Sequence, residues 1–308
     1  MNILSTLQLS SPVTPINHPL LSKKEIQLFI KRDELIHPVI QGNKWRKLKY
    51  NLINAQKNNS QTILSFGGAY SNHLHALAYA ANQLGIQSIG IIRGEAPSPL
   101  NPCLQDITDW GMHLKFITRI EYKQKNVAAF LKNLKQEFGE YYLIPEGGNN
   151  AEGKKGCAEI LSELQDNYDF ICCEIGSGTM FSSLIEHNTN PQTQLLGFAV
   201  MKNPQLDQDI SDSLISLKKQ PAVSTAISTH WKINHDYHFG GFAKTTNELN
   251  DFINTFKRDH NIQLEPVYSG KLLWGIFDLI QQDYFKPGSK LLAIHGGGLQ
   301  GIRGFKDY

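Results

Sequence analysis

The chain has 308 residues, of which 41% are hydrophobic and 19% charged, and its formal net charge at pH 7 is +2. A chain of this length exceeds a usual single core, so we expect two lobes. The balance is that of a globular protein, and no apolar run approaches the roughly 20 residues that span a bilayer. The small net charge, without a long basic run, argues against a nucleic-acid or membrane-surface binder and favours a small-molecule partner.

Segment 1–20 has no basic start followed by an apolar stretch, and it contains Pro12, Pro15 and Pro19. This pattern is unlike a secretory signal, so we expect a cytoplasmic protein.

The amino-terminal half alternates short apolar runs with longer helical patterns. After the helix that follows Lys44, we expect strands at 62–66, 87–92, 113–117 and 141–144, and helices near 74–84, 103–110 and 124–138. This alternation predicts a parallel α/β lobe.

A second series follows, with expected strands at 170–175, 195–200 and 290–295 and helices near 152–165, 179–187, 246–259 and 271–283. It predicts a second α/β lobe. Segment 203–239 is polar and lacks a clear period, so no element is assigned to it.

The four cysteines are spaced unlike a metal or redox pair, at positions 103, 157, 172 and 173. Cys172 and Cys173 are neighbours in an expected strand, where their side chains point to opposite faces. We therefore interpret the cysteines as buried thiols of a reducing compartment and expect no metal site.

Glycine-rich turns follow three of the expected strands, at 67–72, 176–179 and 296–298. Ligands of open parallel sheets bind beyond the carboxyl ends of the strands, where such turns lead into helix N-termini. The three turns together predict one anion-binding cleft.

Lys44 follows a Gly-Asn turn and begins a helix whose apolar residues recur at helical spacing, at Trp45, Leu48, Leu52 and Ala55. Asn43 is the expected N-cap. Lys44, Arg46, Lys47 and Lys49 crowd the first turns, where the helix dipole disfavours cations, so an anion is expected nearby.

A catalytic lysine needs a neutral amine, and burial or the neighbouring cations Arg46 and Lys47 would lower its pKa toward that form. The alternative is a solvated basic helix start, which is the rule for an isolated lysine.

The turn formed by Gly176, Ser177, Gly178, Thr179 and Met180 offers backbone N–H groups and two hydroxyls at a helix start. Such a loop suits a phosphate dianion, and the alternative is a tight strand-to-helix turn. It lacks both the lysine of a P-loop and the spacing of a dinucleotide fold, which favours a compact phosphorylated cofactor over ATP or NAD.

Ser71, Asn72 and His73 open another helix. Capping of the helix and binding of a substrate carboxylate both use its free N–H groups, so both interpretations stay open. His73 and His75 are two residues apart, which does not place two metal ligands on one helical face.

The chain resembles the pyridoxal-phosphate family of 1-aminocyclopropane-1-carboxylate deaminases and D-cysteine desulfhydrases. The resemblance rests first on IKRD at 30–33, GNKWRKL at 42–48 and SFGGAYSNH at 65–73. It continues in the family's order with IPEGG at 144–148, the loop at 176, EPVYSGK at 265–271 and HGGG at 295–298.

The resemblance implies a fold-type-II pyridoxal-phosphate enzyme, similar to the tryptophan synthase β-subunit, with the cofactor between two open α/β lobes. The small lobe would span 48–148, and the large lobe would comprise 1–47 and 149–308. A homodimer is the assembly that we expect.

The resemblance also implies the cofactor contacts. Lys44 would hold pyridoxal 5'-phosphate as a Schiff base, Asn72 would contact the ring hydroxyl, and loop 176–180 would hold the phosphate. Ser269 stands where the deaminases have a glutamate that pairs with the pyridine nitrogen.

On the substrate side, the resemblance implies that Ser71, with the backbone of Asn72 and His73, meets the substrate carboxylate and assists proton transfer. Tyr268 would lie over the reacting carbons, and Gly147 would line the substrate site. Taken alone, Tyr268 would be interpreted as a core aromatic residue.

Three departures from the family bear on the substrate. A neutral hydroxyl at Ser269 supports a weaker electron sink than a carboxylate does, which favours β-elimination over ring opening. Gly296 matches neither the threonine usual in the desulfhydrases nor the leucine of the deaminases. A second tyrosine of the deaminases aligns with Phe239, and Tyr237 is a candidate substitute for it.

We therefore expect α,β-elimination of a small amino acid, with D-cysteine first, giving pyruvate, ammonia and hydrogen sulfide. The enzymatic alternative is deamination of 1-aminocyclopropane-1-carboxylate to 2-oxobutyrate and ammonia. A further alternative is a non-catalytic protein that binds the cofactor or an amino acid.

Overall fold

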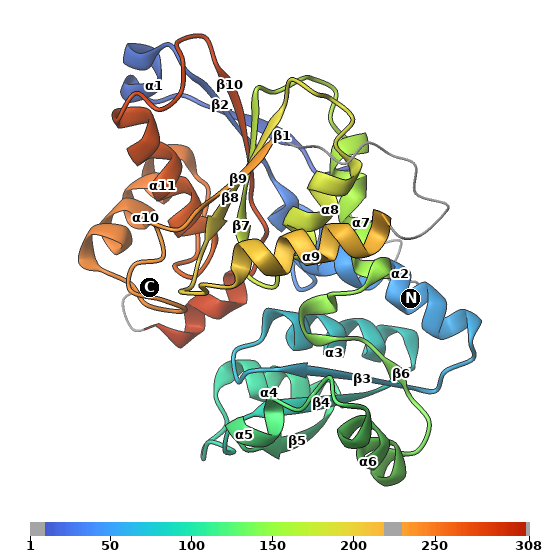
Figure 1. Cartoon of the computed structure of the whole chain (residues 1–308). Helices are drawn as coiled ribbons and strands as arrows, with labels where there is room; N and C mark the ends of the chain where they lie inside the picture. Colours follow the sequence, from blue (N-terminus) through green and yellow to red (C-terminus); the bar gives the residue numbers. More distant parts are fainter. Residues whose placement is uncertain (1–9, 219–229, 306–308) are drawn as a thin grey trace.

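Two open sheets organise residues 10–218 and 230–305, the part of the chain that the computed structural model describes (Figure 1). The larger sheet has the strand order β1-β2-β10-β7-β8-β9, and the smaller has the order β5-β4-β3-β6. In the described residues, β1 and β2 belong to the large sheet, β3 to β6 form the small one and β7 to β10 return to the large one, so the chain crosses twice between the lobes.

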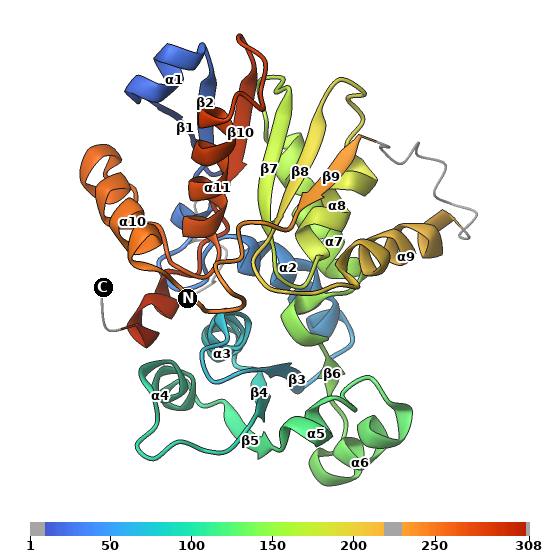
Figure 2. The same cartoon turned by 60° about the vertical axis from the view of Figure 1, so that its left-hand side comes forward.

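The large sheet consists of β1 (Val13–Ile16), β2 (Gln27–Lys31), β7 (Phe170–Ile175), β8 (Gln194–Ala199), β9 (Trp231–Asn234) and β10 (Lys290–Ile294). The edge strand β1 is antiparallel to β2, and the other neighbours are parallel. One face packs against α1 (Pro19–Lys24), α10 (Asn247–His260) and α11 (Ser269–Gln281). The other packs against α7 (Ala151–Ser162), α8 (Thr179–His187) and α9 (Leu206–Lys218) (Figure 2).

The adjacent thiols of β7 show this two-sided packing. Cys172 lies in the core beneath α10 and α11, whereas Cys173 lies in the core beneath α7 and α8. All four cysteines are free and buried, as the sequence predicts for their thiols.

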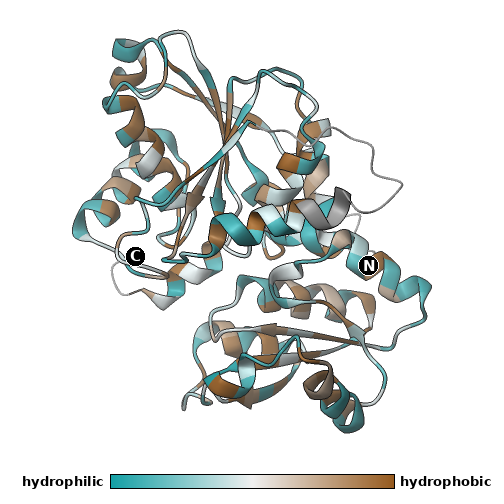
Figure 3. Cartoon of the chain, viewed as in Figure 1, coloured by the Kyte–Doolittle hydropathy of each residue, from teal (hydrophilic) through white to brown (hydrophobic). Residues whose placement is uncertain are grey.

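The small sheet consists of the parallel strands β3 (Thr62–Gly67), β4 (Gln87–Arg93), β5 (His113–Ile117) and β6 (Tyr142–Leu143). Its first face packs against α2 (Asn43–Lys57), α3 (Asn72–Leu84) and α4 (Pro102–Asp109). Its second face packs against α5 (Arg119–Tyr122) and α6 (Ala128–Phe138). Hydrophobic residues follow the strands of both sheets (Figure 3), as expected for parallel strands covered on both faces.

Every strand expected from the sequence is present, and the expected helices are present with ends shifted by a few residues. Among the described residues, the α-helices and strands without a sequence assignment are β1, β2, β9, α1, α5 and α9, and the short 3-10 helices Asp33–Leu35, Glu146–Gly148 and Leu299–Gly304 also had none. Of these, α9 and β9 fall inside the aperiodic segment 203–239, of which residues 219–229 lie outside the described part of the chain.

The start of α2 differs from the prediction, because Gly42 is the N-cap and Asn43 is already the first helical residue. Gly42 has a φ of 56°, and a Cβ atom there would lie 2.1 Å from the Gly296 carbonyl oxygen. Only glycine fits this close approach. The Asn43 side chain is thereby released from capping and contacts Lys44 and Glu174 instead.

No helix in the described residues combines the length and apolar character needed to cross a membrane.

Candidate active site

The three glycine-rich turns meet between the two sheets, as the sequence predicts. Gly296 contacts the start of α2, and a Cβ atom on Gly298 would lie 2.6 Å from Asn72 Nδ2 at the start of α3. A Cβ atom on Gly147 would lie 3.1 Å from Ser177 Oγ in the turn after β7. We call this region, around Lys44, the central site.

Lys44 is the second residue of α2 and is half-buried. Its Nζ donates a hydrogen bond to Asn43 Oδ1 and lies 5.8 Å from the centroid of the Tyr268 ring. Burial, followed by the Lys47 ammonium, lowers the pKa of Lys44 to about 7. A lysine with this pKa is partly neutral at neutral pH and can attack a carbonyl group.

The other cations of α2 divide into two kinds. Lys47 is buried, and its Nζ lies 3.4 Å from Ser177 Oγ, so its expected effect on Lys44 is confirmed. Arg46 points the other way and bonds to Asp33 and Glu163 at 2.6 to 2.9 Å. The expectation that Arg46 lowers the pKa of Lys44 is therefore wrong, because two carboxylates neutralise its charge.

The loop that ends β7 gathers groups suited to an anion. Gly178 takes a φ of 79° at the N-cap of α8, and the Ser177 and Thr179 hydroxyl oxygens lie 3.0 Å apart. The Thr179 hydroxyl donates to Asn149 Oδ1 at 3.1 Å, and Met180 anchors the helix in the core. Two hydroxyls, the helix N-terminus and the Lys47 ammonium thus converge near one point.

The start of α3 lies on the other side of Lys44. Ser71 caps the helix, because its Oγ accepts the Leu74 N–H at 3.2 Å, which confirms the capping interpretation. Its own hydroxyl hydrogen is not used by that bond. Asn72 accepts a hydrogen bond from Gln300 Nε2 through its Oδ1.

His73 is buried, with its Nε2 2.9 Å from Ser65 Oγ and its Nδ1 without a partner among the described residues. Burial, followed by Lys44 and Lys47, lowers its pKa to about 3, so the ring is neutral. The described residues contain no group of three or more His, Cys, Asp or Glu side chains that could hold a metal ion.

Tyr268 borders the central site from the start of α11. Its ring packs on Gly176, where a Cβ atom would lie 3.1 Å from Cε1, and is 6.1 Å from the Phe242 ring. Burial, aided by nearby carboxylates, raises the pKa of the phenol, so it stays protonated and able to donate.

Ser269 is fully buried and tied to Glu265. Its Oγ accepts the Glu265 N–H at 2.9 Å and lies 3.3 Å from Glu265 Oε1, to which it donates. The Glu265 carboxylate also accepts the backbone N–H groups of Val267, Tyr268 and Ser269 at 2.6 to 2.8 Å. This carboxylate is therefore fully hydrogen-bonded within its own turn.

Glu174 is a central residue that the sequence reasoning missed. It is buried near the end of β7, directly before the loop at 176. Burial raises its pKa to about 8. The signal was present, because Glu174 is the only charged residue in the apolar run from Phe170 to Ile175.

Tyr237, the candidate substitute for the second tyrosine of the deaminases, uses its hydroxyl elsewhere. Its hydroxyl donates to Asp278 Oδ2 at 2.8 Å, and its ring packs against Phe198 and Trp274 in the core. Phe239 also packs against Trp274, with the ring centroids 5.2 Å apart. Neither residue offers a hydroxyl to the central site.

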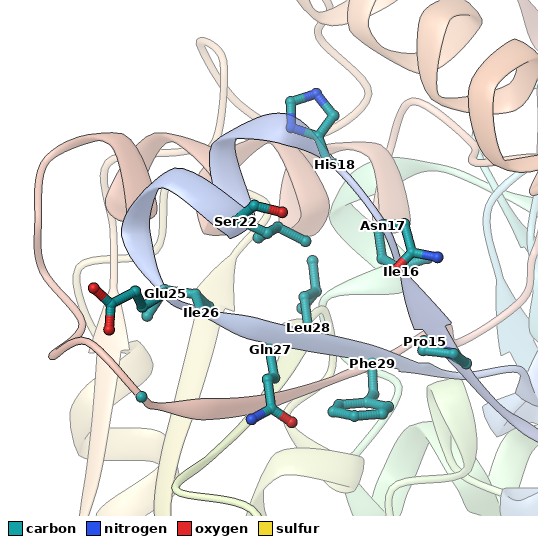
Figure 4. A pocket seen from close by; sticks show the side chains of 12 residues that line it. Pro15, Ile16, Asn17, His18, Ser22, Glu25, Ile26, Gln27, Leu28 and Phe29 are labelled. Atoms are coloured by element: carbon teal, nitrogen blue, oxygen red, sulfur yellow. The ribbon is translucent and has the colours of Figure 1, made fainter.

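A surface pocket of about 530 Å³ lies elsewhere, among α1, β2 and the loop before β10 (Figure 4). Gln27 and Gly288 in its lining mark the amino ends of the parallel strands β2 and β10. Ligands of open parallel sheets bind at the opposite, carboxyl ends, where the central site lies.

Comparisons with known proteins agree with this geometry. A family model described as pyridoxal-phosphate dependent enzyme matches residues 8–297. A Pyrococcus horikoshii protein named putative 1-aminocyclopropane-1-carboxylate deaminase is 30% identical over 303 residues, which cover 96% of this chain and 92% of that protein.

An Arabidopsis thaliana protein named bifunctional D-cysteine desulfhydrase/1-aminocyclopropane-1-carboxylate deaminase, mitochondrial, is 28% identical, covering 90% of this chain and 73% of its own length. The crystal structure of an ACC deaminase homologue superimposes with a TM-score of 0.83 at 25% identity, covering 96% of this chain and 91% of that one. The likeness thus extends over both lobes.

Proposed function

The chain belongs to the pyridoxal-phosphate dependent enzymes, with the two α/β lobes of fold type II, and from that premise we propose that it is a lyase acting on a small amino acid. D-cysteine is the first candidate. Its conversion consumes water and gives pyruvate, ammonia and hydrogen sulfide.

The residues of the central site fit the cofactor. Lys44 has the lowered pKa that covalent attachment to an aldehyde requires. The loop 176–180 combines hydroxyls and a helix N-terminus with the Lys47 ammonium, as a phosphate dianion requires. Four buried side-chain atoms have no partner among the described residues, and two of them, His73 Nδ1 and Glu174 Oε2, border the central site and are available to a ligand.

Bound pyridoxal phosphate supplies an electron sink for negative charge at the substrate α-carbon. In the proposed site, Lys44 holds the cofactor and moves the proton at that carbon. Asn72 is assigned to the cofactor ring hydroxyl, and Ser269 borders the ring from the α11 side.

The substrate carboxylate is assigned to the start of α3. Ser71 donates its free hydroxyl hydrogen to a carboxylate oxygen, and the backbone N–H groups of Asn72 and His73 supply the positive end of the helix. Neutral His73 leaves this surface without a competing charge. Gly147 leaves room beside Ser177 at the edge of the site.

Tyr268 is assigned to the reacting carbons. Its ring lies beside Lys44, and its raised phenol pKa keeps a proton available for the leaving thiolate.

Tyr237 and Phe239, the two described residues considered for the second tyrosine of the deaminases, supply no hydroxyl to the central site, and this observation favours D-cysteine over 1-aminocyclopropane-1-carboxylate. Tyr237 is committed to Asp278, and Phe239 has no hydroxyl. Expulsion of sulfide needs one acid near the β-carbon, which Tyr268 provides. Opening a cyclopropane ring is the harder reaction, and neither Tyr237 nor Phe239 supplies the hydroxyl that the second tyrosine provides in the deaminases.

The test compares kcat/KM for D-cysteine, L-cysteine, D-serine and 1-aminocyclopropane-1-carboxylate, with release of 2-oxo acid as the common readout. We expect D-cysteine to give the highest value. A higher value for the cyclopropane substrate would refute the substrate assignment, and no turnover of any amino acid by the loaded protein would favour the binding-protein alternative.

We also propose a cytoplasmic homodimer whose small lobe spans 48–148. The four buried free thiols support a reducing compartment, and the strands of the small sheet all lie between 62 and 143. Helix α2 runs across the first lobe boundary. The homodimer is carried over from the family resemblance, and sedimentation of the purified protein tests it.

A further inference from the structure

Glu174 is a buried carboxylate whose hydrogen bonds are incomplete. Its Oε1 accepts one long bond from Asn43 Nδ2, at 3.4 Å, and its Oε2 has no partner among the described residues. A buried carboxylate is costly unless it is bonded, so an unpaired oxygen beside a ligand site points to the ligand.

Gly296 makes room for this carboxylate. A Cβ atom at position 296 would lie 1.9 Å from Glu174 Oε1 and 2.8 Å from Asn43 Nδ2. The Glu174 side chain therefore fills the space that a side chain at 296 would take. Glycine here is explained by Glu174, which accounts for the departure from both threonine and leucine.

Ser269 is poorly placed to bind a ligand, because its hydroxyl group is already used within the protein. It is fully buried, donates to Glu265 and accepts from the Glu265 backbone. Glu265 in turn has three backbone N–H partners. In the described part of the chain, Glu174 and Glu265 are the buried carboxylates that act on Lys44, and of these two only Glu174 has an oxygen without a partner.

We propose that Glu174, and not Ser269, is the partner of the pyridine nitrogen of the bound cofactor and keeps a proton on that nitrogen. This inference rests on the proposed cofactor site at Lys44. At neutral pH the raised pKa leaves a proton on the Glu174 carboxyl group. This proton passes to the ring nitrogen, and the resulting carboxylate makes a charge-assisted hydrogen bond to the protonated ring, which strengthens the electron sink. Ser269 alone would imply a weak electron sink. With Glu174 of β7 at the ring nitrogen, the bound cofactor is instead a strong electron sink.

The first test measures the protonation of the nitrogen directly. The wild-type protein and Glu174→Gln are loaded with cofactor labelled with ¹⁵N in the ring, and the nitrogen resonance is recorded. We expect the resonance of a protonated pyridine in the wild type and of an unprotonated one in Glu174→Gln. Ser269→Ala should keep the wild-type resonance.

The matched control is Glu186→Gln, which removes another buried carboxylate of the large lobe, one that is paired with Lys154. It should also keep the wild-type resonance. A protonated resonance in Glu174→Gln, or its loss in Ser269→Ala, would overturn the assignment.

A second test uses binding instead of the resonance. The apoprotein should bind the cofactor about 10- to 100-fold more tightly than its 1-deaza analogue, the value of a hydrogen bond to a charged group. Glu174→Leu, whose side chain has no hydrogen-bonding group, should lose this preference, and so should Gly296→Ala, whose added Cβ displaces the carboxylate. An unchanged preference in both variants would contradict the inference.

Failure of the inference and failure of the proposed function are distinguishable. Borohydride reduction of the wild type should fix the cofactor to Lys44 whatever faces the ring nitrogen. Fixation at Lys44 with an unchanged nitrogen in Glu174→Gln would refute only the role of Glu174, whereas fixation elsewhere would refute the site itself.

Discussion

The first turns of α2 carry cationic side chains on two sides, and these cations have carboxylate partners on one side but not on the other. On the side facing α7, Arg46 bonds to Asp33 and Glu163, and Lys49 bonds to Glu159. On the side facing the central site, Lys44 and Lys47 have no carboxylate within bonding distance among the described residues, and both have lowered pKa values.

The presence or absence of a carboxylate partner, and not the residue type, therefore decides the role of each cation. Helix α7 supplies Glu159, and its C-cap supplies Glu163, one turn further along the same face. The crowded cations at the start of α2 predict a nearby anion. On the side facing α7, the protein supplies this anion as carboxylates. On the side facing the central site, we expect a ligand to supply it.

The largest expected effect of breaking this arrangement is on turnover. Lys44→Ala removes the amine that holds the cofactor and moves the proton, and we expect kcat to fall by at least about 10²- to 10⁴-fold. Lys49→Ala on the paired side is the control and should keep kcat near that of the wild type. Similar losses in both variants would mean that the basic helix start acts as a whole.

The cations on the side of α2 facing α7, which are paired with carboxylates, should instead contribute to the free energy of unfolding. Arg46→Met leaves Asp33 and Glu163 beside an apolar side chain, and we expect the free energy of unfolding to fall by about 3–5 kcal/mol. Urea denaturation measures this change. Asp166→Asn, which breaks the exposed pair with Lys290, is the control and should cost at most about 1 kcal/mol. A loss below that of the control would contradict the structural role of Arg46.

A smaller effect is expected at Lys47. Its ammonium lowers the pKa of Lys44, so Lys47→Gln should raise that pKa and shrink the neutral fraction of Lys44 at pH 7. The pH profile of the rate of cofactor attachment to the apoprotein should then have its midpoint at a higher pH than in the wild type.

The midpoint, rather than the affinity, is the informative quantity for Lys47, because this residue also lies beside the phosphate loop. Lys49→Gln should leave the midpoint in place. A midpoint at lower pH in Lys47→Gln than in the wild type would mean that Lys47 raises the pKa of Lys44, which would contradict the assigned effect.

The smallest effect belongs to Lys49. Its pair with Glu159 is partly exposed, so Lys49→Gln should change the free energy of unfolding by at most about 1 kcal/mol. Chemical denaturation beside Arg46→Met checks this, and a loss as large as that of Arg46→Met would erase the distinction between a buried network and a surface pair.

Much of the fold follows from local patterns in the sequence. The parallel strands, buried on both faces, form continuous apolar runs, and their glycine turns mark the carboxyl edge. The elements β1, α1 and β9 were not predicted, because their four to six residues are too few to show a period. The positions of β1 and β9 are set by pairing with β2 and β8.

The site was less predictable, because burial and pairing between distant residues decide it. Nothing near Arg46 in the sequence shows that Glu163, more than a hundred residues later, neutralises it. Glu174 is visible as a charge in an apolar strand, but its relation to Gly296 appears only when β7 and the turn after β10 are side by side.

The most direct test of the account is the identity of the lysine that carries the cofactor. The purified protein, loaded with pyridoxal phosphate, is reduced with borohydride, digested and mapped by mass spectrometry. We predict that the modified peptide carries the cofactor on Lys44. Lys47 and Lys49 should be unmodified, and so should Lys271, a buried lysine of α11 whose Nζ donates to three backbone carbonyl oxygens. Stoichiometric modification of any of those three lysines, with Lys44 free, would contradict it.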